Sequence, residues 1–228
     1  MLRSSAECLS NLYFTSWPIL LIFEVCMRIV GLIFILLMVF SGIAAIFWYQ
    51  EMQYLLPTPL PKNYRVVLPQ EIIRFDSVLL PQKNERPKLL HFFSPECPCS
   101  RFNLKHFLAL NKKYSKTIDF YVVIENKEEV TAAKYMVEGA VPIIVDSNER
   151  LAKACGVYST PQAALIQQNN QLYFRGNYNR SRFCTDKNSN FVQMAMDSLL
   201  AGKGPPHFIE LATQSYGCSI SEDQESDI

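Results

Sequence analysis

The hydrophobic positions of the chain form one long uninterrupted block and several short, patterned runs. The block, residues 29–48, reads IVGLIFILLMVFSGIAAIFW and has no charged side chain over twenty residues. A helix of that length crosses about 30 Å of hydrocarbon, whereas a buried core helix normally carries a polar stripe. The block therefore predicts one transmembrane helix.

The charges that flank this block predict its orientation. Arg28 precedes it and the first charge beyond it is Glu51, so the positive-inside bias places residues 1–28 in the cytoplasm and everything after Gln50 outside. Translation that starts at Met27 would give the short basic start of a signal anchor, which leaves residues 1–26 outside the protein. A cleaved signal peptide is the alternative, but the apolar run is too long for one, and an uncleaved anchor is favoured.

The rest of the chain divides into a spacer, one domain and a tail. Residues 51–63 carry three prolines, which favour extended backbone and predict a spacer that holds the domain off the bilayer. Residues 64–203 have the size of one domain with one core. Residues 204–228 end in the acidic, polar run SEDQESDI, which predicts a disordered tail.

Within the domain, the periodicity of the apolar residues alternates between strand and helix. The predicted order is a strand at 88–93, a helix to about 115, a strand at 118–124, a helix at 126–137, a strand at 141–145, a short helix ending at Gly156, a hairpin of the runs AALIQ and QLYFR, and a helix at 188–200. This order predicts an α/β fold: a mixed sheet with helices on both faces.

Composition excludes several classes of function. The chain is 49% hydrophobic, so disorder is not its main state, and 22 Lys and Arg against 21 Asp and Glu are too balanced for a nucleic-acid partner. Seven cysteines are too few for a disulfide-built scaffold, so each thiol needs its own explanation. The three histidines are scattered without metal-ligand spacing, and neither a metal site nor a cofactor is expected.

One thiol stands where a helix is predicted to begin. The strand ending in KLLHFF meets SPECPCS, in which Cys97 is the expected N-cap and Pro98 the first helical residue. The free N–H groups of Cys99 and Ser100 would then point toward the Cys97 sulfur. A helix N-terminus favours the thiolate, the form that attacks disulfides.

Two charged neighbours of Cys97 act in opposite directions. Arg101 supports a thiolate, and Glu96 opposes it. The alternative interpretation of Cys97 is a buried, inert cysteine. The exposed edge expected where a strand ends at proline and a helix begins argues against it.

These motifs together resemble a known fold family. The strand leading into Cys97-Pro98-Cys99-Ser100, then GVYSTPQAALI and a hairpin, resemble the thioredoxin superfamily. With the signal anchor, SPECPCSRFN and RGNYNRSRFC, the chain resembles an uncharacterised family of membrane-anchored bacterial thioredoxin-like proteins over residues 86–203. The resemblance implies a thioredoxin-like mixed sheet and a cis Thr160-Pro161 bond beside the reactive cysteine. It also implies that the Thr160 backbone binds an extended substrate peptide.

The chain departs from the family's usual pair of cysteines. Ser100 occupies the place of the second cysteine and Cys99 comes one residue early, where a bond to Cys97 would be strained. The resembling fold brings Cys184 to the same end as Cys97, with arginines nearby. Cys184 is therefore the expected redox partner of Cys97 or Cys99, although a structural or idle role remained open. Cys155 is expected in the core, and Cys218 in the tail is a mobile thiol within reach of the site.

The leading functional interpretation is a membrane-anchored periplasmic thiol-disulfide oxidoreductase with Cys97 as nucleophile. Its expected partners are protein thiols and disulfides and an electron donor. Three alternatives stay open. A peroxiredoxin-like peroxidase is suggested by Ser94, three residues before Cys97. A Cu(I) chaperone would use two close thiolates, and a non-catalytic interaction module would use the fold alone.

Overall fold

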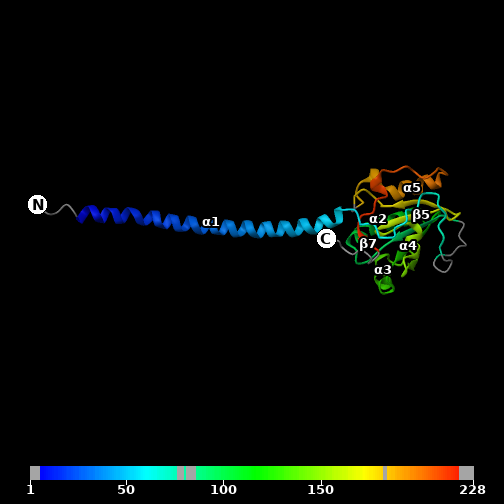
Figure 1. Cartoon of the computed structure of the whole chain (residues 1–228), viewed down its shortest axis with the longest axis horizontal. Coiled ribbons are helices and arrows are strands. Elements are labelled where there is room, and N and C mark those ends of the chain that lie inside the picture. The colour runs from blue at the N-terminus through cyan, green and yellow to red at the C-terminus, as the bar shows by residue number, and fades with distance from the viewer. Residues whose placement is uncertain (1–5, 76–79, 81–85, 182–183, 221–228) are drawn as a thin grey trace. The chain divides into compact units, whose positions relative to one another are not determined.

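The computed structural model of the chain describes residues 6–75, 80, 86–181 and 184–220. The chain separates into two compact units, residues 1–53 and residues 54–228. The first unit is a helix, and the second contains the sheet (Figure 1).

The first unit consists of most of α1, Ala6–Leu55. Residues 22–50 of this helix are long and apolar enough to cross a membrane, so the predicted span of 29–48 lies inside a longer apolar helix. The helix continues through Glu24, whose carboxylate lies 3.8 Å from the Arg28 guanidinium one turn later. An i, i+4 pair of this kind supports helical backbone through charged residues.

The second unit is built on a five-stranded sheet in the order β3-β2-β1-β5-β6. Its strands are β1 (Lys88–Phe92), β2 (Asp119–Ile124), β3 (Ile143–Val145), β5 (Gln162–Ile166) and β6 (Leu172–Gly176). β1 runs parallel to β2, and β2 runs parallel to β3. β5 is antiparallel to both β1 and β6. This is the mixed sheet that the sequence predicted.

Helices cover both faces of the sheet because alternate strand residues are apolar on both sides. Leu89 of β1 packs in one core with α2 (Pro98–Tyr114), α3 (Val130–Met136) and α5 (Phe191–Leu200). The next residue, Leu90, packs in the other core with α4 (Arg150–Cys155) and with Val67 of the preceding segment. Three 3-10 turns complete the described helices: η1 (Lys127–Glu129), η2 (Lys187–Ser189) and η3 (Glu210–Ala212).

Neighbouring residues define both ends of α4. The side chain of Asp146 accepts the N–H groups of Leu151 and Ala152 at 2.9–3.1 Å, which satisfies the first turn of α4. Gly156 ends that helix at a φ of 69°, a conformation that glycine adopts without a steric penalty. In the hairpin, Asn170 has a φ of 63°, as its sequence predicted.

The expectation of a disordered tail is wrong for residues 204–220; residues 221–228 lie outside the described part. η3 belongs to this segment, and β7 (Cys218–Ser219) pairs with β4 (Ser159–Thr160). Asn177 holds the segment through its N–H, which donates to Ala212, and its side chain, which donates to Leu211 and Gln214. We call residues 204–220 the C-terminal segment.

The segment between α1 and the domain is also bound rather than a free spacer. The Thr58 N–H donates to the Ser215 carbonyl at 2.9 Å, and its hydroxyl donates to the Gly217 carbonyl at 3.1 Å. Tyr64 donates to the Gly156 carbonyl at 2.9 Å. Prolines leave extended backbone, but the donors that remain between them find acceptors in the domain.

Candidate functional site

Cys97 stands where β1 has ended and α2 begins. It is the N-cap of α2 in extended backbone, with Pro98 as the first helical residue, as predicted. Its N–H donates to the Ser94 carbonyl at 3.2 Å, which closes the turn from the strand into the helix. Only 2% of Cys97 is exposed, so the expected open edge is covered.

Cys97 forms a disulfide with Cys218. The two Cα atoms are 6.0 Å apart, and 121 positions separate the residues in the sequence. The structure therefore joins Cys97 to the tail thiol, rather than to Cys99 or Cys184. The reason is that the C-terminal segment is anchored along its length and delivers Cys218 to the helix N-terminus.

Cys218 reaches Cys97 because β7 pairs with the strand before the proline. Thr160 faces Cys218 and Ser159 faces Ser219 in antiparallel register. The Thr160-Pro161 bond is cis, as the resemblance implied. The Thr160 carbonyl oxygen lies 3.5 Å from the Cys97 sulfur. The backbone edge that was expected to bind a substrate strand is thus occupied by the chain's own Cys218.

Gly217 permits this close pairing. Its φ is 134°, and a β-carbon at this position would collide with the Thr160 carbonyl. The carbonyl of Gly217 is at the same time the acceptor for the Thr58 hydroxyl. The Gly217 backbone therefore lies between Thr160 and Thr58, and these two contacts fix the turn before Cys218.

A cavity of about 250 Å³ adjoins the disulfide and is lined by both cysteines. Its charged lining is acidic and consists of Glu96, Glu125, Glu129 and Asp146. Burial raises the pKa of Glu129, and hydrogen bonds from Asn126 and Ser94 oppose this while the charge of Glu96 adds to it. Burial also raises the pKa of Asp146, and the hydrogen bonds that its carboxylate accepts from backbone N–H groups oppose this increase. This acidic lining was missed because its members come from three separate stretches of sequence.

The predicted supporting residues take different positions. Ser100 is fully buried, and its hydroxyl accepts the Ser94 N–H at 3.4 Å, so it fastens the turn below Cys97. Cys99 is buried in the first turn of α2 and forms no disulfide. Arg101 is exposed and does not line the cavity, whereas Glu96 does.

Cys184 lies against α2 in a different environment. The Asn103 side-chain amide donates to its sulfur at 3.2 Å. Burial raises the pKa of Cys184 to about 12, and this hydrogen bond only partly opposes the effect. At neutral pH such a thiol is almost entirely protonated and a poor nucleophile. Of the arginines expected near it, Arg175 instead donates to the Thr213 carbonyl at 3.3 Å, and Arg182 lies outside the described residues.

Cys155 is fully buried in α4, as predicted, and burial raises the pKa of its thiol. Among the described residues, no group of three or more His, Cys, Asp or Glu side chains is placed to hold a metal ion. The Cys97–Cys218 arrangement could support reversible opening and closing of this bond beside an acidic cavity.

Comparison with known proteins gives a family and a fold. A family model described as Domain of unknown function (DUF6436) matches residues 68–220. No curated protein matches the chain. The matched residues contain every element of the sheet together with Cys97 and Cys218.

Among solved structures, a hypothetical protein from Sinorhizobium meliloti matches 69% of this chain and 96% of its own length, with 20% identity and a TM-score of 0.58. An uncharacterized conserved protein from Geobacillus kaustophilus matches 73% of this chain and 97% of its own, with 19% identity and a TM-score of 0.55. These likenesses concern the fold. The strand order, the helices on both faces and the cis-proline beside a cysteine at a helix N-terminus make that fold thioredoxin-like.

Proposed function

The chain belongs to the family described as Domain of unknown function (DUF6436), and we propose that it is a membrane-anchored thiol-disulfide oxidoreductase. In this proposal Cys97 is the nucleophile and Cys218 is the resolving thiol. The single observation that carries it is the disulfide between them, located at the N-terminus of α2 and beside Thr160. A purely structural disulfide has no need of a helix N-terminus, whereas a reactive thiolate is favoured there.

The exchange consists of two displacements. The Cys97 thiolate attacks one sulfur of a partner disulfide, whose bond breaks and whose second sulfur leaves as a thiolate and takes a proton. The Cys218 thiolate then attacks the Cys97 sulfur, and the partner's first sulfur leaves. Two thiols of the protein have given two electrons and two protons to the partner. A dithiol donor restores them by the same steps in reverse, and the relative reduction potentials set the direction.

A partner gains access when β7 leaves the edge of β4. Reduction removes the covalent link, so non-covalent contacts alone hold the C-terminal segment, among them the β4–β7 pairing and the hydrogen bonds of Thr58, Asn177 and Arg175. The freed Thr160 backbone then accepts an extended partner segment in the same register. Cys218 thus acts both as the resolving thiol and as part of the cover.

The acidic cavity favours a class of partner. Four carboxyl side chains line it beside the two sulfurs, so a segment with Lys or Arg next to its cysteine is attracted, and an acidic one is repelled. We propose basic cysteine-containing segments as the preferred partners. The same carboxylates oppose the Cys97 thiolate, and the helix N-terminus offsets them.

The proposed location is the outer face of the inner membrane, with the domain in the periplasm. One apolar helix long enough to serve as an anchor precedes the domain, and the charges that flank the predicted span favour this orientation. An oxidising compartment is also where a Cys97–Cys218 disulfide persists.

The proposal is tested by trapping the mixed disulfide. The reduced full chain is mixed with oxidised glutathione and its intact mass is followed. Cys218→Ser is expected to accumulate a stable glutathione adduct on Cys97, because no thiol resolves it. Wild-type protein should pass through the adduct to the internal disulfide.

Two variants complete the test. Cys97→Ser is expected to form no adduct at the site. Cys184→Ser is expected to behave as wild type, because the Cys184 thiol that it removes is protonated and a poor nucleophile. If the adduct is still resolved in Cys218→Ser but is no longer resolved in Cys184→Ser, then Cys184 is the resolving thiol. Absence of any adduct on Cys97 in every variant would end the proposal.

A further inference from the structure

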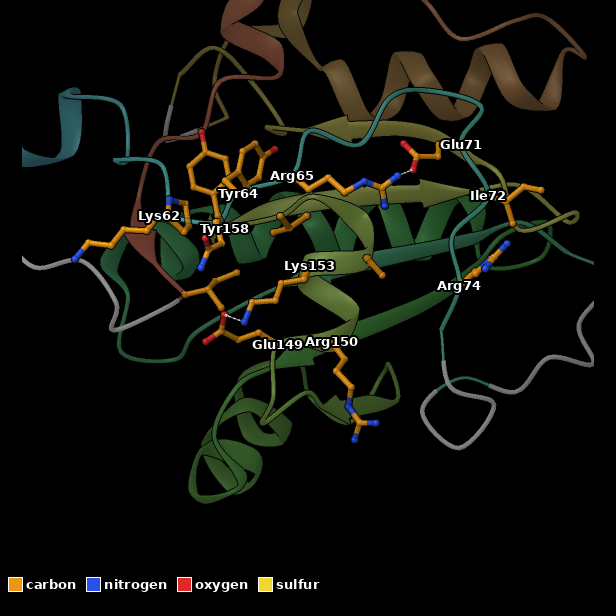
Figure 2. A pocket seen from close by; sticks show the side chains of 15 residues that line it. Lys62, Tyr64, Arg65, Glu71, Ile72, Arg74, Glu149, Arg150, Lys153 and Tyr158 are labelled. Atoms are coloured by element: carbon orange, nitrogen blue, oxygen red, sulfur yellow. Dashed lines mark hydrogen bonds and ion pairs between the residues drawn. The ribbon is translucent and has the colours of Figure 1, made fainter.

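A second, larger hollow shares Ile220 with the disulfide cavity but is lined by neither cysteine, and it plays no part in the proposed exchange. Its volume is about 1120 Å³, and it is lined by residues from 61–74, 149–158 and Ile220 (Figure 2). Known ligand pockets cover roughly 300–1,000 Å³, so this hollow is broad enough for more than a small ion.

The charged lining of this hollow is predominantly basic. Its cationic side chains are spaced around it in Figure 2 and are Lys62, Arg65, Arg74, Arg150 and Lys153. The two carboxylates in the lining are already engaged, Glu71 with Arg65 and Glu149 with Lys153 at 3.2 Å. Five cations against two carboxylates leave an excess of three positive charges. Such a surface favours an anionic ligand.

The wall between these charges is aromatic and aliphatic. Tyr64 and Tyr158 pack edge to face, with ring centroids 4.8 Å apart. The Tyr64 hydroxyl donates a hydrogen bond to the Gly156 carbonyl. Ile72 lines the hollow and is 61% exposed. An anion with an apolar part attached fits this lining better than a free inorganic ion, since Tyr and apolar side chains suit a half-apolar ligand.

The segment that forms one wall also exposes apolar side chains outside the hollow. Leu60, Val66 and Leu68 are 62%, 59% and 62% exposed. Lys62, Arg65 and Arg74 belong to the same stretch of chain. Exposed apolar side chains beside Lys and Arg are the composition of surfaces that bind anionic membranes.

This stretch directly follows the helix that is long enough to span a bilayer. The last residue of α1 is Leu55, and Pro61 at the rim is six positions later. An extended chain covers at most about 3.6 Å per residue, so Pro61 lies within about 22 Å of the helix end. The ligand available at that distance from an inserted helix is the headgroup layer.

We propose that this hollow, together with the exposed apolar side chains of Leu60, Val66 and Leu68, binds the headgroups of anionic phospholipids. The phosphate is held among the cations, the glycerol region contacts Tyr64 and Tyr158, and the exposed leucines and Val66 enter the acyl boundary. The proposal does not depend on the oxidoreductase proposal, since no lining cation belongs to the thiol site.

The first test uses the full chain in neutral detergent, titrated calorimetrically with dihexanoyl-phosphatidylglycerol, dihexanoyl-phosphatidylcholine or glycerol 1-phosphate. We expect the phosphatidylglycerol to bind more tightly than the other two. The triple variant Lys62→Gln, Arg74→Gln, Arg150→Gln should weaken its binding about a hundredfold, because each basic residue near an anionic surface contributes roughly a fivefold effect. The matched control is Lys105→Gln, Lys116→Gln, Lys134→Gln, which removes three exposed charges outside the hollow and should change little.

The second test places the full chain in vesicles of phosphatidylcholine, with or without phosphatidylglycerol, and follows hydrogen exchange. Residues 61–74 and 150–158 should be protected by phosphatidylglycerol in wild type but not in the triple variant. Equal protection in both kinds of vesicle, or an equal loss in the control variant, overturns the proposal. Glycerol 1-phosphate that binds as tightly as the lipid also overturns it, because the ligand is then a soluble phosphate.

Discussion

Thr160 and Cys218 face each other as partners in the antiparallel pair β4–β7, and the Thr160 carbonyl oxygen lies 3.5 Å from the sulfur to which Cys218 is bonded. The backbone edge beside the cis-proline and the resolving thiol are therefore parts of one small structure. Its stability determines how readily the edge opens.

The disulfide should make a large contribution to stability when oxidised. It closes a loop of 121 positions, and a loop of about that length corresponds to roughly 2–5 kcal/mol. Cys218→Ser should lower the free energy of unfolding by that amount under oxidising conditions, measured by denaturant titration. Under reducing conditions the difference from wild type should nearly vanish, and a difference that persists would mean that the side chain stabilises the fold in another way.

Loss of the Thr58 hydroxyl should loosen the C-terminal segment. This hydroxyl donates to the Gly217 carbonyl at 3.1 Å, and a typical hydrogen bond contributes about 1 kcal/mol. Thr58→Val should therefore speed reduction of the disulfide by dithiothreitol about fivefold. Thr213→Val is the control, since that hydroxyl bonds to Glu210 within its own turn at 3.1 Å. An equal effect in both variants would show that the link to residue 58 has no special role.

A side chain at position 217 should prevent β7 from pairing. Gly217 has a φ of 134° and its missing β-carbon would meet the Thr160 carbonyl; strained backbone of this kind costs about 1–3 kcal/mol. Gly217→Ala should slow formation of the Cys97–Cys218 disulfide in a glutathione buffer and shift its equilibrium toward the thiols. Gly204→Ala, at a position with nothing within 4 Å of the new carbon, should leave both quantities unchanged.

The acidic lining should select basic partners. Model peptides with Lys beside their cysteine should react with the oxidised protein faster than peptides with Glu, and added salt should reduce the difference. Glu96 is exposed at the cavity, so Glu96→Gln should also reduce it. The same change at Glu138, which is exposed and outside the lining, provides the control. Equal rates for both peptides with wild type would contradict the proposed preference.

The buried His91 should make the fold sensitive to acid. Burial lowers the pKa of His91 to about 3, whereas an unfolded histidine has a pKa near 6.5. Between these two pKa values the unfolded chain binds a proton that the folded chain does not. The contribution of His91 to the free energy of unfolding is therefore complete above about pH 6.5, and below it falls by about 1.4 kcal/mol per unit of decreasing pH. His91→Gln keeps a polar partner for Tyr178, whose hydroxyl lies 2.8 Å from His91, and should remove this slope. His207→Gln, on an exposed side chain, should retain it.

The sheet and the helix that begins at Cys97 could be predicted from local patterns, because apolar periodicity and capping residues determine them over a few neighbours. Leu89 and Leu90 point to opposite cores simply because strand side chains alternate. The pairing of Cys218 could not be predicted in the same way. Its strand is two residues long, and its position depends on the adjacent Gly217 and on Asn177 and Thr58, which are distant in the sequence.

The surroundings of Cys184 could not be predicted for a related reason. Topology gave the end of the sheet but not the immediate neighbours of the sulfur, and burial next to Asn103 raises the pKa of that thiol to about 12. The acidic lining likewise joins Glu96 and Asp146 only in the folded chain. The burial and the charge of a site depend on residues from distant segments that fold together, and a single sequence does not show which segments these are.

The pairing of β7 with β4 also affects how molecules of this protein meet one another. An uncovered strand edge is a template on which foreign backbone, including that of a second copy, can align. Here the oxidised chain closes that edge with its own last strand. We expect this edge to open only after reduction, so self-association through it is expected in the reduced state alone.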